Sequence, residues 1–82
     1  MEKTLVKIIS STNPRIKKYY GKLMYFYRVG NYSILEEVDR ENYGITTSNV
    51  VSLEENETNI ILETLNSFYT LEKVGNENED IK

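Results

Sequence analysis

The sequence predicts an all-β or β-rich α+β protein, either a small SH3-like barrel or a strongly bent antiparallel sheet of about five strands. Short runs of β-branched and aromatic residues alternate with a period of two. Turn-forming residues separate these runs at close spacing, and no run has the length and periodicity of a long helix. In a chain of 82 residues, closure or strong bending would protect the sheet edges.

In the first third of the sequence, we expect two strands separated by a segment that fits more than one structure. Residues 4–10 are rich in β-branched side chains and lead into a polar cluster that contains Pro14. Residues 15–20 fit either a helical turn capped by Asn13, with Pro14 at its first position, or a basic ordered loop. Residues 22–29 are aromatic-rich and largely apolar on both faces, which is typical of a central strand.

The remainder predicts a β-meander. Residues 32–38 fit a short strand or an irregular turn, and a polar connection follows. Strand character then returns three times, in residues 45–54 with a break near Ser48 and Asn49, in residues 60–65, and in residues 68–74. In residues 60–65, Ile60, Leu62 and Thr64 should share one face of the strand. The α+β alternative places a helix over the sheet at 13–20 or 33–43.

We expect one domain, residues 1–75, followed by a flexible acidic tail, residues 76–82. Charge is divided along the chain. Residues 1–30 carry seven basic residues and one acidic residue, whereas residues 31–82 carry three basic and twelve acidic residues. Such a chain can present one basic and one acidic face, or its two parts can neutralise each other across a sheet. Cross-strand pairing of opposite charges favours the second outcome.

Several residue types needed for common chemistry are missing. The chain contains no histidine and no cysteine, so the usual general base, the thiol nucleophile and most zinc sites are absent. Adjacent carboxylates, such as Glu36 and Glu37, would point to opposite faces of a strand. We therefore expect a protein that is not an enzyme and has no cofactor or metal. The lack of a long apolar run predicts a cytoplasmic protein without a membrane partner.

A basic and aromatic segment is the first candidate binding site. Basic side chains interleaved with aromatic rings can contact a nucleic-acid backbone and stack on bases, although the same tyrosines could instead pack in the sheet. The overall pI of 4.9 is unusual for a dedicated DNA-binding domain. The candidate residues are Arg15, Lys17, Lys18, Tyr19, Tyr20, Lys22, Tyr25, Tyr27 and Arg28.

The tyrosine content is the second candidate feature. Seven tyrosines occur in the chain, and tyrosine is a frequent anchor in protein interfaces. An exposed tyrosine patch beside acidic strands would suit a protein partner, including one whose surface normally holds nucleic acid. That arrangement requires the acidic residues at 36, 37, 39, 41, 54, 55 and 57 to share one face.

The C-terminal half also resembles a known group of proteins. A T-S-x-V strand over residues 46–53 precedes a T-x-N-S-x-Y-x-L hairpin over residues 62–71. This pair of segments resembles the end of small accessory proteins encoded by phages and mobile elements of Firmicutes. The resemblance implies a phage-type accessory protein that counters a host defence system, and it implies no active-site residues.

These features together predict a non-enzymatic protein-binding module, in its most concrete form a phage-encoded inhibitor of a host or anti-phage defence protein. One alternative is a small-barrel nucleic-acid-binding protein that uses residues 15–28. Another is a structural phage protein that self-associates as a homo-oligomer through open strand edges.

Overall fold

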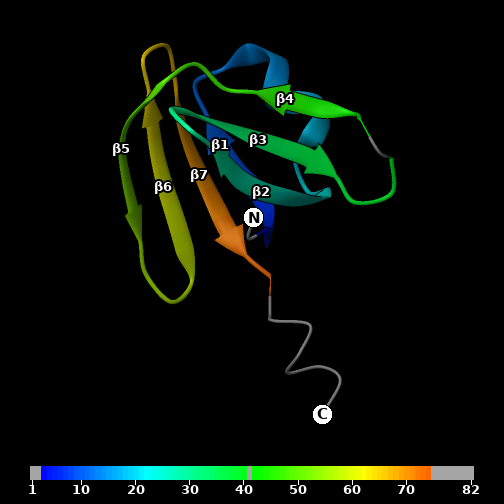
Figure 1. Ribbon diagram of the computed structural model, residues 1–82. Coiled ribbons are helices and arrows are strands. Elements are labelled where there is room, and N and C mark those ends of the chain that lie inside the picture. Colours follow the sequence, from blue (N-terminus) through cyan, green and yellow to red (C-terminus); the bar gives the residue numbers. More distant parts are fainter. Residues whose placement is uncertain (1–2, 41, 75–82) are drawn as a thin grey trace.

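The computed structural model describes residues 3–40 and 42–74, which form seven β-strands and one short 3-10 helix, η1 (Figure 1). The all-β prediction is confirmed, and the predicted tail at 76–82 lies outside the described residues. In chain order the elements are β1 (Thr4–Ser11), η1 (Pro14–Tyr19), β2 (Leu23–Val29), β3 (Tyr32–Glu37), β4 (Gly44–Thr46), β5 (Val50–Glu55), β6 (Asn59–Thr64) and β7 (Phe68–Lys73).

All seven strands belong to one antiparallel sheet with the order β4-β3-β2-β1-β7-β6-β5. The sheet is neither closed into a barrel nor strongly curled, so the predicted SH3-like barrel and the strongly bent five-stranded sheet are wrong. Closure would require β4 to pair with β5, but these strands form the two opposite edges. The strand count is higher than predicted mainly because the run 45–54 divides into β4 and β5.

The division between β4 and β5 occurs where the sequence predicts a break. The Thr47 backbone N–H still donates to Ser33 O, at 2.9 Å, and thus continues along β3. Two residues later, Asn49 O accepts from the backbone N–H of Leu65 at the end of β6. These bonds tie the connecting segment to β3 on one side and to the end of β6 on the other, as the chain passes from one edge strand to the other.

Strand β1 occupies the centre of the sheet and pairs with β2 on one side and β7 on the other. Val6 lies opposite Met24 of β2, and Ile8 lies opposite Leu71 of β7. A register shift between Ile8 and Ser10 places an additional residue in β1 at this point. The N-terminal strand therefore joins the β2–β4 meander to the β5–β7 meander.

One face of the sheet carries the hydrophobic core. The right-handed twist that accumulates across a sheet sets β2–β4 at a wide angle to β5–β7, as Figure 1 shows, and apolar residues from both groups share the core. The predicted alternation is confirmed in β6, where Ile60, Leu62 and Thr64 are all buried. The core residues are Val6, Ile8, Ile16, Tyr19, Met24, Phe26, Leu35, Ile60, Leu62, Tyr69 and Leu71.

The segment between β1 and β2 is the capped helical turn rather than the basic ordered loop. The Asn13 side chain accepts a hydrogen bond from the Arg15 backbone N–H, at 2.9 Å, and Pro14 begins η1. Ile16 and Tyr19 of η1 are both buried in the core. The helix therefore covers part of the apolar face that the sheet alone would leave open.

Strand β4 approaches β3 closely because it begins with glycine. A Cβ atom on Gly44 would lie 2.0 Å from the backbone oxygen of Leu35, so any side chain there would separate the two strands. The carbonyl oxygen of Gly44 also accepts a hydrogen bond from the Tyr19 hydroxyl, at 3.3 Å. Gly44 thus allows a short edge strand to pair while it contacts the helix side of the core.

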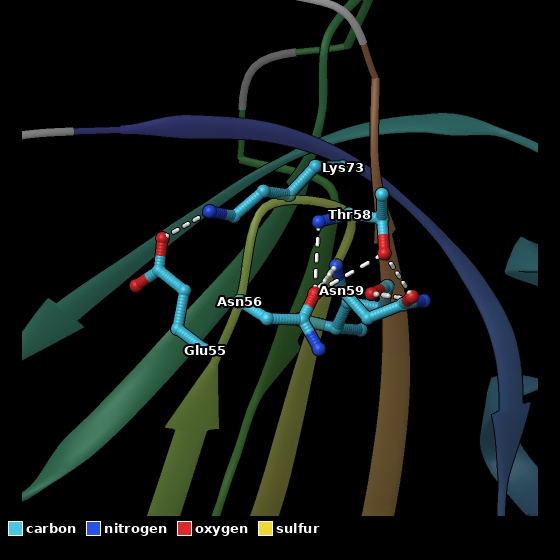
Figure 2. Close-up of polar contacts among 6 residues, drawn as sticks. Glu55, Asn56, Thr58, Asn59 and Lys73 are labelled. Carbon is cyan, nitrogen blue, oxygen red and sulfur yellow. Dashed lines mark hydrogen bonds and ion pairs between the residues drawn. The ribbon is translucent and has the colours of Figure 1, made fainter.

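The turn between β5 and β6 has its own polar network, shown in Figure 2. The Asn56 side-chain oxygen accepts hydrogen bonds from the backbone N–H groups of Thr58 and Asn59, each at 2.8 Å. Beside the turn, Lys73 of β7 forms an ion pair with Glu55 of β5 (Figure 2). This pair crosses over β6, and together with the turn it holds the end of the edge strand in register.

Opposite charges from the two parts of the chain meet within the sheet. Lys3 lies 3.7 Å from a Glu36 oxygen, and Lys22 lies 3.7 Å from a Glu37 oxygen. In both pairs a basic residue from the first third faces an acidic residue of β3. Part of the charge division in the sequence is thus neutralised by strand pairing.

The one-sided core leads to a paired prediction on stability. Leu71 is fully buried, whereas Leu65 is 67% exposed. Leu71→Ala should lower the free energy of unfolding by about 2–5 kcal/mol, because it removes core contacts and leaves a cavity. The same change at Leu65 should alter it by less than about 0.5 kcal/mol. Urea unfolding followed by circular dichroism measures both, and equal losses would contradict the assignment of the core face.

Candidate binding surfaces

The structure distributes the predicted basic and aromatic segment over several separate places. Arg15, Lys17 and Lys18 are exposed on η1, and Tyr20 is partly exposed at its end. Tyr19 instead points into the core. This first group therefore offers basic charge with one accessible ring.

The rest of the segment lies elsewhere. Lys22 pairs with Glu37, and the Arg28 guanidinium donates to Gly30 O, at 3.0 Å, in the β2–β3 turn. Tyr25 and Tyr27 are half-buried on the face of β2 opposite the core. We call that side of the sheet the outer face. The two tyrosines are therefore separated from the η1 cations by the sheet itself.

On the outer face, Tyr25 and Tyr27 form a cluster with Lys3 and Glu36. The Lys3 ammonium lies 5.2 Å from the centre of the Tyr25 ring and 4.9 Å from that of Tyr27. Both distances are within the range of a cation–π contact. Glu36 lies directly across from Tyr25 in the β2–β3 pairing and binds the same ammonium. Two rings and a carboxylate thus surround one cation.

The Glu36 carboxylate is held in place by donors other than the lysine. The Tyr27 hydroxyl donates to one of its oxygens and the Asn42 backbone N–H to the other, each at 3.3 Å. The Glu36 side chain is 16% exposed, whereas that of Lys3 is 44% exposed. The carboxylate is therefore a fixed part of the surface, and the cation is its more accessible partner.

This environment raises the pKa of Tyr27 above its usual value of 10.0. The main cause is burial of the phenol, which disfavours the phenolate, followed by repulsion from the Glu36 carboxylate and the hydrogen bond that this carboxylate accepts. The Lys3 ammonium acts in the opposite direction. The neutral phenol is thus the form that this site stabilises.

A shallow hollow of about 230 Å³ adjoins the cluster and shares Tyr27 and Glu36 with it. Its other walls come from β3, β4 and the connection between them. Tyr43, which is 52% exposed and stacks with Arg40, forms part of the rim. The remaining lining residues are Ile34, Leu35, Asn42, Gly44, Ile45 and Thr46.

A second feature is a set of exposed apolar side chains on β1 and around β5–β7. Ile61 and Phe68 alternate with core residues, so they point outward from adjacent strands. Leu65 follows Ile61 at the same period. Two further residues sit at the register shifts in β1 and β5. We call this set the apolar patch: Ile9, 49% exposed, Val51, 56%, Ile61, 42%, Leu65, 67%, and Phe68, 53%.

Acidic side chains accompany the apolar patch. Glu54 lies opposite Ile61, and Glu63 lies opposite Phe68, in the strand registers of β5–β7. Glu72 follows on β7, across from Lys7 of β1. The patch is therefore bordered mainly by carboxylates, and its chemistry differs from that of η1.

The acidic residues considered in the sequence do not gather on one face. Glu36 lies on the outer face of β3, while Glu37 is buried beside Lys22. The acids at 54, 55 and 57 belong to the β5–β6 hairpin, and residue 41 lies outside the described residues. The tyrosine cluster on β2 and β3 and the acidic β5–β6 hairpin are thus separate surfaces, and they do not form the single tyrosine-and-acid face considered from the sequence.

The described ranges, 3–40 and 42–74, contain no group of three or more acidic side chains that could hold a metal ion. Within the same residues, no helix is long and apolar enough to cross a membrane.

Comparisons of the chain with protein-family models, with curated proteins and with solved structures found no match. The fold defines a small all-β protein with a single open sheet. The resemblance of residues 46–53 and 62–71 to phage accessory proteins stays a prediction, because no comparison tests it.

The position of Tyr27 predicts a pH dependence of stability at alkaline pH. Its folded-state pKa is raised, so the stability that this provides is present below the unfolded-state pKa of about 10 and is lost as the pH rises through the folded-state pKa. Above pH ~10, the wild type should lose stability relative to Tyr27→Phe. Urea unfolding measures the free energy of unfolding of both proteins across this range. The wild-type value minus the Tyr27→Phe value should fall as the pH rises, and a value that stays constant or increases would contradict the prediction.

Proposed function

We propose that this protein is a non-enzymatic protein-binding module and that the apolar patch is its main contact surface. The observation that carries the proposal is the exposure of five large apolar side chains on β1 and around β5–β7, among which Ile61 and Phe68 point outward from adjacent strands. Exposed apolar surface of this kind costs solubility and is typical of interaction sites. Phe68 and Ile61 lie on adjacent strands at its centre and are the expected anchors.

Charge around the patch favours one kind of partner. Glu54, Glu63 and Glu72 would repel an acidic surface and attract a basic one. The partner that fits is a protein with an apolar surface bordered by lysine and arginine side chains. A protein that normally binds nucleic acid has such a border, and this supports the host or anti-phage defence protein implied by the phage-type resemblance.

The nucleic-acid alternative depends on η1 rather than on the apolar patch. Arg15, Lys17 and Lys18 are exposed on η1, but Tyr19 is buried and the outer-face tyrosines lie elsewhere. Of the tyrosines in that segment, Tyr20 alone is exposed beside these cations, so stacking on bases there would depend on a single ring. Self-association is the third possibility, because β5 is an edge strand of six residues.

The proposal is tested by weakening the patch without disturbing the core. The double variant Ile61→Ser and Phe68→Ser removes the two expected anchors, and Tyr20→Ser removes a ring outside the patch that is as exposed as Ile61. Each protein is used to capture partners from a bacterial host lysate, and the retained protein is then purified and titrated. Wild type and Tyr20→Ser should bind it at equal affinity, and the double variant should bind it at least about 30-fold more weakly.

Three results would contradict the proposal. The first is a partner that binds the double variant as tightly as wild type. The second is a mobility shift with nucleic acid that weakens steeply with salt and is lost when Lys17 and Lys18 are replaced. The third is a mass, measured by light scattering, that rises with concentration for wild type but not for the double variant, which would make the patch a self-association surface.

A further inference from the structure

We propose that Tyr25, Tyr27 and Glu36 form a binding site for the ammonium group of a lysine side chain on a partner protein, and that Lys3 occupies this site in the free protein. The site lies on β2 and β3, away from the apolar patch, so it is independent of the proposed contact surface. The two rings project from the same side of β2 at positions i and i+2.

The geometry already matches an ammonium ligand. The Lys3 ammonium is 5.2 Å and 4.9 Å from the two ring centres and 3.7 Å from a Glu36 oxygen. Ring faces attract a cation through their quadrupole, and a carboxylate adds a direct charge. Together these groups offer what an isolated surface carboxylate lacks, a cation site with walls on more than one side.

The site is organised by contacts that do not involve Lys3. The Tyr27 hydroxyl and the Asn42 backbone N–H hold the two oxygens of Glu36, and strand pairing sets Tyr25 opposite Glu36. Removal of Lys3 would therefore leave the rings and the carboxylate in place. A site that keeps its shape without its occupant can accept another cation at little structural cost.

The adjoining hollow explains why a lysine side chain fits better than a small cation. It shares Tyr27 and Glu36 with the ammonium site and is further lined by Ile34, Tyr43 and Thr46. A lysine from a partner could place its ammonium between the tyrosine rings and its aliphatic stem in the hollow, beside Ile34 and Tyr43. The partner's ammonium would have to displace that of Lys3. Lys3 lies just before the first residue of β1, so this displacement does not require a strand residue to move.

The Lys3 ammonium competes with any external cation for this site, so removal of Lys3 should change the measured affinity. Lys3→Ala should vacate the site, which raises the fraction of protein competent to bind an external ammonium. The probe is Nα-acetyl-lysine methylamide, with tetramethylammonium as a second probe and sodium chloride at equal ionic strength as the salt control. Ring resonances of Tyr25 and Tyr27 report binding in an NMR titration.

We expect saturable shifts of these resonances, with the lysine probe binding Lys3→Ala about five- to tenfold more tightly than wild type. Addition of Glu36→Gln to Lys3→Ala should weaken binding about tenfold. Tyr20→Leu in the Lys3→Ala background removes an exposed tyrosine outside the site and should change nothing. Amide spectra confirm that each variant keeps the fold.

Unsaturable shifts equal to those produced by sodium chloride would overturn the inference. So would equal affinities for Lys3→Ala with and without Glu36→Gln. Binding of tetramethylammonium alone would overturn the assignment to a lysine side chain, because the hollow would then contribute nothing.

Discussion

The pairing of β1 with β7 is the interaction on which the rest of the structure depends. Each of the groups β2–β4 and β5–β7 is a local meander, and a small isolated meander has little core of its own. Val6 and Ile8 of β1 join them, because this strand pairs with both β2 and β7. β1 and β7 are far apart in the sequence, so their pairing closes a long loop and costs conformational entropy. Burial of the core that this pairing completes must offset that cost.

A single sheet with one core also determines what is available for binding. Core residues from both groups and from η1 fill one face, and the outer face has no covering layer in the described residues. On that face the two halves of the sheet differ. β2 and β3 carry tyrosines around a carboxylate, whereas β5–β7 carry exposed apolar residues among acids. The proposed functions follow from this difference rather than from any enclosed cavity.

The sequence predicted those features that depend on local pattern. Asn13 and Pro14 predicted the capped turn, and the alternation of Ile60, Leu62 and Thr64 predicted the buried face of β6. The edge positions of β4 and β5 could not be predicted. They depend on the point after Thr47 at which the chain stops pairing with β3 and crosses to β6. A short run of strand-like residues does not specify its partners.

The outer-face sites were hidden for the same reason. Lys3, Tyr25 and Glu36 come together only through two strand pairings, and no sequence spacing reveals that contact. The alternation in β6 predicts that Ile61 faces away from the core, but not that its face is uncovered. Ile9 sits at a register shift, which period-two patterning cannot locate.

Native-state hydrogen exchange tests the central role of β1 most directly. If β1 joins the two meanders into one cooperative unit, backbone amides of Val6, Ile8 and Leu71 should be among the slowest to exchange. Protection in β2–β3 and in β6–β7 should then be lost with the same dependence on denaturant. Persistent protection of β5–β7 after β1 and β2 have exchanged would contradict the account, because it would show that the second meander is stable without the β1 pairing.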